Sequence, residues 1–372
     1  MQIRNLKYLL LACTLLLAGC GLSAKRSVSE SGQSSVSAGG VPTNNMQWGA
    51  SGGLSFSGDS AYAYVAGQVA FGPRVPGTDA HHDCVQYIGR TLERFGATVE
   101  IQTGEVMRYD GEWQHVANIC AHLPADSAYQ GEKTVLLCAH YDSRPWADQE
   151  EDYSHRMSPI PGANDGASGV GVLMEVARQW QNLSERKRPV EIVLFDCEDM
   201  GTPQFYTGKQ REHTWCLGAQ LWARMVVESR KSKVESGLSA QRSVSESGQS
   251  SVSAAVYAYG ILLDMVGDPN ASFPREYYSE QYAGKYVEKI WRTAEQLGYG
   301  HRFVSTRSYP ITDDHYYVNT IAKIPCVDII HYVPGSETGF AWWWHTHSDD
   351  MRNVNPGTLQ EVGKVLMAVL VE

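Results

Sequence analysis

Short runs of apolar residues alternate along this chain with longer segments of helical periodicity. The run TVLLCAH at Thr134–His140 and the run VEIVLFD at Val190–Asp196 consist largely of apolar residues. Such a strand has to be covered on both faces, which is typical of a parallel sheet between two layers of helices. We therefore predict an α/β fold, a three-layer αβα sandwich with a mixed, mainly parallel central sheet. The expected strands are Thr134–His140, Val190–Asp196, Tyr259–Met265 and Pro325–His331, and the expected helices are Asp79–Phe95, Ala167–Gln181, Leu217–Glu228, Tyr282–Leu297 and Thr358–Val371.

Composition and charge indicate a globular protein and argue against nucleic-acid binding. The chain has 372 residues, of which 43% are hydrophobic and 19% are charged, so it can form one large core. The formal net charge of -10 argues against a nucleic-acid partner, because such a partner requires a basic surface. Beyond the N-terminal segment, no apolar run in the sequence is long enough to span a bilayer.

The N-terminal segment has the features of an export signal. Arg4 and Lys7 precede a short apolar stretch, which ends in Leu17-Ala18-Gly19-Cys20 and resembles a bacterial lipobox. We predict that residues 1–20 are a lipoprotein signal peptide and that lipid on Cys20 is the protein's sole attachment to a membrane. The expected location is the periplasmic side or the outer membrane of a Gram-negative bacterium. A plain signal peptide with a chance cysteine is the alternative.

A polar segment follows the signal and recurs later in the chain. We predict a flexible tether at 21–60, a catalytic domain at 61–372 and an inserted low-complexity loop at 230–256. The segment 21–38 is repeated at 237–254 and differs only in having Lys25 where the second copy has Gln241. The cysteines include no C-x-x-C pair, which argues against a structural zinc knuckle. An exported protein can form disulfides, but the sequence does not give their connectivity.

Acidic residues and histidines gather where the expected strands end. The carboxyl ends of parallel strands meet at one edge of a sheet, where ligands bind. Burying several carboxylates in one place is costly unless a cation neutralises them, so we predict a metal site. The residues are His140 and Asp142, then Asp165, then Asp196, Glu198 and Asp199, then Asp264, then Asp313, Asp314 and His315, and finally His345 and His347.

Zn²⁺ is the expected ion. A catalytic zinc site uses three protein ligands of the histidine and carboxylate types and leaves one position open, and Asp165, Asp199 and His345 supply such a set. Glu198 is next to a ligand in sequence, and in a strand-end loop it can point into the site as a general acid or base. Any one of these residues alone would indicate a helix cap or a solvated group, so the prediction rests on the whole set.

Several motifs together resemble a known family. HYDS, GANDGASGV, FDCED, LLDMVG and WHT, in this order, resemble the zinc aminopeptidase superfamily with the M28-like fold. QVAFGPRVPGT at 68–78, LLDMVGDPNASFP at 262–274, and the DDH at 313–315 followed by WHT at 344–346 resemble its glutaminyl cyclase branch of bacterial type. The likeness covers residues 60–372 apart from the segment 230–256.

The resemblance implies a role for each matching residue. Asp165, Asp199 and His345 match the ligands of a single zinc ion, and Glu198 matches the proton shuttle. Asp264 and Asp313 match paired acidic residues near the substrate, with Asp313 both catalytic and substrate-binding. Trp344 matches an aromatic residue that lines the glutamine pocket. A second pocket tryptophan of the animal enzymes has no clear counterpart, and the candidates for its place are Phe205, Tyr206 and Trp215.

The function that the resemblance implies is a glutaminyl-peptide cyclotransferase. Such an enzyme closes an N-terminal glutamine of peptides or proteins to pyroglutamate and releases ammonia, here with one zinc ion in a monomer. The alternative is a two-zinc aminopeptidase, in which His140 and Asp264 bind a second zinc ion, Asp165 bridges the two ions and Glu198 activates water. A non-catalytic scaffold would require a degenerate site, and none of these residues is missing.

Overall fold

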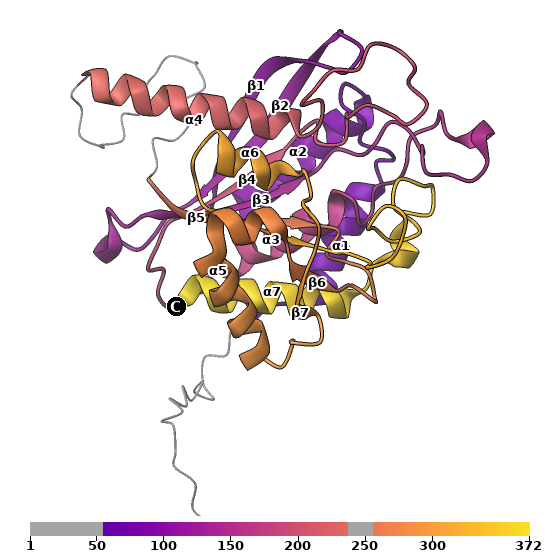
Figure 1. Ribbon diagram of the computed structural model, residues 1–372. Helices are drawn as coiled ribbons and strands as arrows, with labels where there is room; N and C mark the ends of the chain where they lie inside the picture. The colour runs from indigo at the N-terminus through magenta and orange to yellow at the C-terminus, as the bar shows by residue number, and fades with distance from the viewer. Residues whose placement is uncertain (1–54, 237–255) are drawn as a thin grey trace, which may run out of the picture. The chain divides into compact units, whose positions relative to one another are not determined.

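The computed structural model describes residues 55–236 and 256–372 (Figure 1). The predicted signal peptide, nearly all of the tether and most of the low-complexity insert lie outside these residues. Two boundaries differ from the prediction. Helix α1 (Gly58–Val69) begins inside the expected tether, because Ser57 caps it by accepting a hydrogen bond from the amide of Ser60. Helix α4 (Leu217–Ser236) continues into the expected loop.

The central sheet is mixed and mainly parallel, as predicted. Its strand order is β1-β2-β4-β3-β5-β8 (Figure 1). Strands β3 (Thr134–His140), β4 (Val190–Phe195), β5 (Tyr257–Asp264) and β8 (Cys326–Ile330) are parallel to one another. Nearly all of their residues are buried, which is why they appear in the sequence as continuous apolar runs.

An antiparallel hairpin that the sequence did not indicate forms one edge of the sheet. It consists of β1 (Thr98–Met107) and β2 (Trp113–Leu123), and β2 continues antiparallel onto β4. Buried and exposed positions are mixed along β1, so its sequence lacks the apolar run that identified the central strands. A small separate sheet pairs β6 (Phe273–Arg275) with β7 (Phe303–Arg307).

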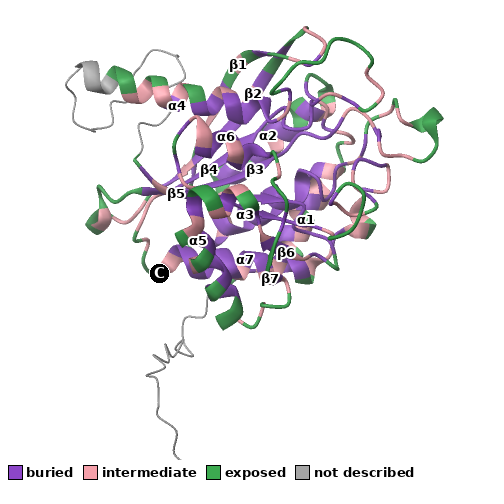
Figure 2. Cartoon of the chain, in the orientation of Figure 1, coloured by how far each residue is buried: buried purple, intermediate pink, exposed green. Residues whose placement is uncertain are grey.

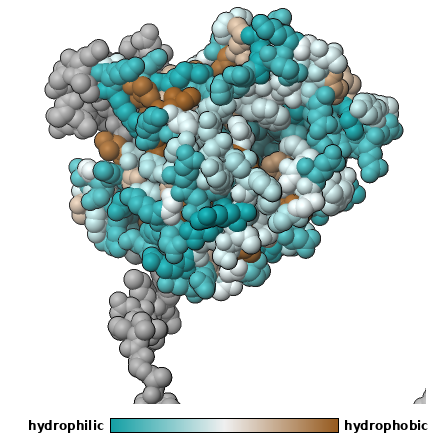
Figure 3. All heavy atoms as spheres, in the orientation of Figure 1, coloured by the Kyte–Doolittle hydropathy of each residue, from teal (hydrophilic) through white to brown (hydrophobic). Residues whose placement is uncertain are grey.

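Helices cover both faces of the central sheet and complete the predicted three layers. Along β3, Leu137 and Ala139 pack into a core formed with α1, α2 (Asp79–Arg94), α3 (Ala167–Trp180), α5 (Tyr277–Gln296) and α7 (Pro356–Val371). The alternate residues Leu136 and Cys138 pack against α4 and α6 (Asp314–Thr320) on the opposite face. Figure 2 shows the buried residues concentrated between these layers, and Figure 3 shows hydrophilic residues over most of the visible surface.

Helix α3 lies unusually close to the strands beneath it, and this approach places the loop before α3 at their carboxyl ends. A Cβ atom on Gly169 would lie 2.3 Å from the carbonyl oxygen of Leu263 and 3.0 Å from the Cβ of Ala139. Glycine is therefore required at this contact. In the described part of the chain no helix is long and apolar enough to cross a membrane.

We expect Gly169→Ala to lower the free energy of unfolding by about 1–3 kcal/mol, because the added methyl group pushes α3 away from β5. Chemical denaturation of the metal-free protein measures this change. Gly284→Ala is the matched control, since a Cβ there meets no atom closer than 3.9 Å. Equal stability of the two variants would contradict the close packing of α3.

Candidate active site

Polar side chains lie at the carboxyl ends of the parallel strands, at one edge of the sheet. His140 is the last residue of β3, Asp264 is the last residue of β5, and Glu198 and Asp199 follow β4 directly. Asp165 lies in the loop before α3, which approaches the same edge. This arrangement is expected where parallel strands share a direction, because their carboxyl ends then open onto a common crevice.

The predicted ligand set comes together in space. Asp165, Asp199 and His345 each offer a ligand atom, and these atoms lie within 4.8 Å of one another. His345 Nε2 lies 3.1 Å from Asp199 Oδ1 and 3.5 Å from Asp165 Oδ2. Ligand atoms around a tetrahedral zinc ion, each bound at about 2.0–2.1 Å, are spaced in the same range. The donor set therefore fits zinc in both type and spacing.

Two carboxylate oxygens of this set make no hydrogen bond to any described residue. Asp165 Oδ2 and Asp199 Oδ2 are buried, and neither has a hydrogen-bond partner among the described residues. Buried carboxylate oxygens are normally hydrogen-bonded, and an unpaired one is costly. A cation held by these two carboxylates and the imidazole of His345 would supply the missing interaction.

The backbone is strained around the site. His345 has a φ of 53°, Cys197 of 55°, Cys216 of 57° and Met265 of 50°, all in the left-handed region. Each of these residues either belongs to the site or adjoins one of its residues. Strained non-glycine residues of this kind persist where the surrounding structure fixes them, often at functional sites.

A layer of buried groups holds the ligands in place, and it was not predicted as such. Asp142 accepts hydrogen bonds from the amides of Glu198 and Asp199, at 3.1 and 3.2 Å. Arg144 donates to both oxygens of Asp148, whose Oδ1 lies 3.4 Å from Nδ1 of His345. A carboxylate on the second nitrogen of a ligand histidine fixes the orientation of its ring.

Two tryptophans also lie against the His345 ring. Trp344 stacks on it with ring centroids 3.6 Å apart, and Trp215 lies parallel to it with centroids 5.9 Å apart. Trp215 and Trp344 both line the site cavity, and of Phe205, Tyr206 and Trp215 it is Trp215 that does so. The other two candidates face elsewhere: Phe205 packs on Trp146 and Tyr206 on Tyr109.

Glu198 points into the same cavity without belonging to the ligand set. Its side chain is close to Asp313, and its Oε1 accepts a hydrogen bond of 3.1 Å from the thiol of Cys216. Burial raises the pKa of Glu198 well above its ordinary value, and the acidic neighbours Asp199 and Asp313 raise it further, although His140 lowers it. A carboxyl group whose pKa is raised in this way is a candidate general acid or base.

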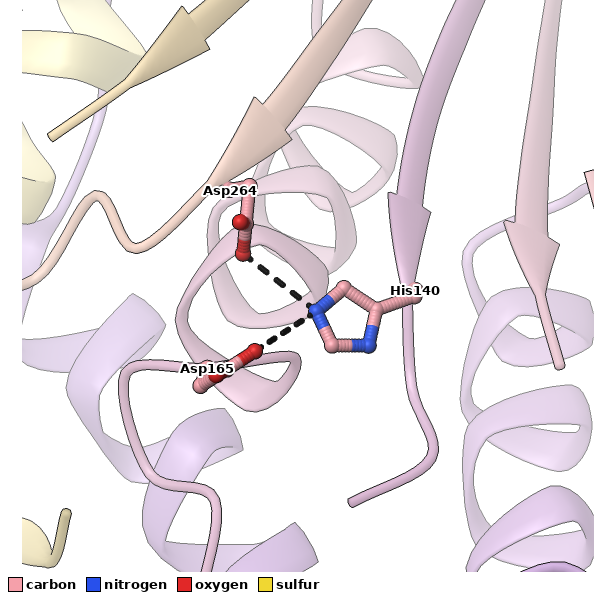
Figure 4. Close-up of side chains that lie close together, drawn as sticks. All are labelled: His140, Asp165 and Asp264. Atoms are coloured by element: carbon pink, nitrogen blue, oxygen red, sulfur yellow. Dashed lines mark hydrogen bonds and ion pairs between the residues drawn. The ribbon is translucent and has the colours of Figure 1, made fainter. Parts of the chain in front are cut away.

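A second group of possible ligands adjoins the first (Figure 4). His140 Nε2 lies 3.0 Å from Asp165 Oδ1 and makes a hydrogen bond of 3.3 Å with Asp264 Oδ1. Asp165 thus contacts both groups, one oxygen with each. His140 Nε2 therefore lies against one oxygen of each carboxylate, as His345 Nε2 does in the first group, and the second group offers the donor types of a second metal site.

The DDH motif divides into two parts in the structure. Asp313 caps α6 and lines the cavity, whereas Asp314 is fully buried outside it. His315 lies between Glu276, at 2.9 Å, and Asp328, at 3.5 Å. Asp314 and His315 therefore do not join the Asp165, Asp199 and His345 set, although they follow Asp313 directly in sequence.

Two further residues complete the comparison with the predicted set. His347 contacts Glu150 and Ser158, each at 2.9 Å, and is not part of the Asp165, Asp199 and His345 set. Asp196 accepts hydrogen bonds from His81 and from the amide of Ala117, which supports the strand end. Neither residue contributes a ligand atom to the metal groups found among the described residues.

The site opens into a cavity of about 510 Å³. Metal-binding and acidic side chains line it together with aromatic and apolar ones. Burial raises the pKa of Asp264 to about 6 and that of Asp313 to about 7, and neighbouring carboxylates add to both increases against the opposing effect of His140. The lining residues include Glu198, Trp215, Asp264, Met265, Ile311, Asp313, Ile330, Phe340 and Trp344.

Comparison with known proteins places this arrangement in a family. Residues 118–370 match the family model described as peptidase family M28. Among curated proteins, the glutaminyl-peptide cyclotransferase of Dictyostelium discoideum is 25% identical over 238 residues, which is 63% of this chain and 58% of that protein.

Solved structures are more similar. The glutaminyl cyclase of Tannerella forsythia is 42% identical with a TM-score of 0.73, and the match covers 85% of this chain and 98% of that one. A Zn-dependent exopeptidase from Parabacteroides distasonis gives the same identity, TM-score and coverage. The chain belongs to peptidase family M28, within which it is similar to the bacterial glutaminyl cyclases.

Proposed function

We propose that this protein is a zinc-dependent glutaminyl-peptide cyclotransferase, which closes an N-terminal glutamine to pyroglutamate and releases ammonia. The observation that carries the proposal is the position of Glu198 beside the Asp165, Asp199 and His345 set, in a cavity shared with Asp264 and Asp313. The likeness to the glutaminyl cyclase of Tannerella forsythia, at 42% identity over 85% of this chain, supports it.

One zinc ion per chain is part of the proposal. Asp165, Asp199 and His345 would hold it, because Asp165 Oδ2 and Asp199 Oδ2 lack hydrogen-bond partners among the described residues. When bound, the ion would act as a Lewis acid toward the γ-carboxamide oxygen of the substrate glutamine.

The protein's own groups perform the proton transfers. The α-amine of the substrate must be neutral to attack the γ-carboxamide carbon, and Glu198 accepts the proton that this nitrogen loses as the new C–N bond forms. Glu198 then returns the proton to the amide nitrogen, which leaves as ammonia when the old C–N bond breaks. Glu198 ends in its starting state. The raised pKa of its carboxyl group suits both transfers.

Ring closure is intramolecular, so holding the glutamine side chain folded back contributes much of the rate. Trp344 and Trp215 form an aromatic wall beside His345, and Ile311 and Phe340 add apolar surface to the same cavity. Asp313 and Asp264 line the same cavity and would accept hydrogen bonds from the substrate amine. This wall and these acceptors give a compact pocket in which a bent side chain is favoured.

A two-zinc aminopeptidase is the second candidate, and a specific observation favours testing it. His140, Asp165 and Asp264 also offer ligand atoms within 4.8 Å of one another. We favour the cyclase because the curated relative from Dictyostelium discoideum is a glutaminyl-peptide cyclotransferase and the similar structure from Tannerella forsythia is a glutaminyl cyclase. The two activities differ in product, since a peptidase would release the first residue as a free amino acid.

Three sequence-based predictions belong to the proposal and concern matters outside the described residues or beyond a single chain. They are lipid attachment at Cys20, location on the periplasmic side or in the outer membrane of a Gram-negative bacterium, and a monomeric state. Peptides or proteins that begin with glutamine would then be the substrates encountered after export.

Incubation with a peptide that begins with glutamine tests the reaction. We expect a mass loss of ~17 Da with equimolar ammonia, abolished by a chelator and restored by zinc. The same peptide with N-terminal leucine in place of glutamine is the control and should stay intact. Release of free glutamine or leucine would instead identify an aminopeptidase.

Glu198→Gln should lower kcat by roughly 10²–10⁴-fold, because the amide cannot take up the proton of the substrate amine. Steady-state kinetics with a Gln-initiated peptide, together with the zinc content of the variant, measures the effect. Glu337→Gln removes another carboxylate that lines the cavity and should keep most of the activity. Near-normal kcat for Glu198→Gln with zinc bound would exclude the proposed proton transfer.

Trp344→Ala should raise KM about 10-fold or more, because it removes the aromatic surface against which the glutamine side chain folds. Trp344→Phe should recover part of the loss. Trp342→Ala is the matched control, since Trp342 is 74% exposed and does not line this cavity. An equal change in KM for the Trp342 and Trp344 variants would argue against a pocket role for Trp344.

A further inference from the structure

The loop that carries Asp165 has its backbone amides fastened to one distant residue. Asp349 Oδ1 accepts a hydrogen bond of 2.8 Å from the amide of Asn164, and Asp349 Oδ2 accepts one of 3.1 Å from the amide of Asp165. The carbonyl oxygen of Asp349 accepts a third, also 3.1 Å, from the amide of Ala163. Three consecutive amides of the loop therefore end on a single, fully buried residue.

The carbonyl groups of the same loop are held from the other side. Arg74 is fully buried, and its guanidinium donates to the carbonyl oxygens of Pro161 and Gly162, each at 2.5 Å. It donates a further hydrogen bond of 3.0 Å to the carbonyl of Tyr141, which follows β3. A buried loop must satisfy all of its backbone groups, and here a carboxylate takes the amides while a guanidinium takes the carbonyls.

Asp349 is also tied closely to another predicted ligand. It lies four residues after His345 in a compact turn, in which the amide of Thr346 donates to the carbonyl of Trp343 and the amide of Asp349 donates to the carbonyl of Thr346, each at 3.1 Å. A displacement of this turn would therefore move His345 together with the Asp349 carboxylate, which holds the amides of Asn164 and Asp165. We call this pair of hydrogen bonds the Asp349 clamp.

We infer that Asp349 is a positioning residue of the zinc site, which sets the spacing between Asp165 and His345 before the metal binds. The inference rests on the zinc site of the proposed function, but it does not depend on the reaction catalysed there. It assigns to Asp349 a task different from that of Asp148, which orients the His345 ring itself. Residues outside the ligand set that fix ligand orientation typically change metal affinity by about 10–100-fold.

The first test is the zinc affinity of Asp349→Asn, measured by competition with a chromophoric chelator. The asparagine oxygen can accept from one loop amide, but its NH₂ group is a donor and faces the other amide, so the clamp opens on one side. We expect affinity to fall by about 10–100-fold, and by at least as much for Asp349→Ala. A folded Asp349→Asn protein that binds zinc as tightly as the wild type would overturn the inference.

A matched variant separates positioning from a general loss of stability. Glu175 in α3 is also a fully buried carboxylate, and it accepts a hydrogen bond of 3.0 Å from the backbone amide of Ser57, away from the ligand set. Glu175→Gln should lower the stability of the metal-free protein and leave zinc affinity unchanged. If it weakened zinc binding as much as Asp349→Asn does, Asp349 would have no specific role.

A measurement on the wild-type protein covers the case in which the Asp349 variants do not fold. Hydrogen exchange of the metal-free protein should show slow exchange at the amides of Asn164 and Asp165, because Asp349 already holds them. Fast exchange at both amides, slowed only by added zinc, would show that the metal orders the loop and would refute the inference. None of these measurements uses catalytic activity, so failure of the proposed reaction would leave their outcome interpretable.

Discussion

Crowding of buried carboxylates at one edge of the sheet is the constraint on which the rest of this structure depends. Asp165, Glu198, Asp199, Asp264 and Asp313 are all buried around a single cavity. Nearby buried cations reach only part of this set: Arg144 pairs with Asp148 and lies 3.7 Å from Asp199. Like charges in a medium of low polarity repel strongly, so the cluster requires a cation, shared protons or both.

The cation and the shared protons would be located in neighbouring parts of the site. Asp165 and Asp199 each keep one buried oxygen without a hydrogen-bond partner among the described residues, and both carboxylates adjoin His345, which suits a metal ion. Asp264 and Asp313 have raised pKa values, which suits groups that share protons. Glu198 lies between these two parts and can exchange protons with a substrate. The fold thus separates metal binding from proton transfer within one cavity.

Much of this could be predicted from the sequence because it depends on local patterns. The buried strands appeared as apolar runs, and the predicted Thr134–His140 coincides with β3. Because parallel strands end at a common edge, the polar residues that follow them could be expected to meet, and Asp165, Asp199 and His345 do meet. The start of α5 was placed too late, since Glu276 caps a first turn that a non-helical residue, Ala283, separates from the rest of the helix.

The remaining features depend on contacts between residues far apart in the sequence. No local pattern indicates that Asp349 accepts from the amide of Asp165, 184 positions away, or that the thiol of Cys216 contacts Glu198. Nor does a local pattern indicate that Asp313 lines the cavity, whereas His315 is held between Glu276 and Asp328.

One zinc ion bound by two carboxylates and one histidine is tested most directly by locating zinc in crystals of the metal-loaded protein. Anomalous scattering at the zinc absorption edge gives this location. We expect one strong anomalous peak per chain, within bonding distance of Asp165, Asp199 and His345. A second peak of comparable height between His140 and Asp264, or a single peak elsewhere, would contradict this expectation.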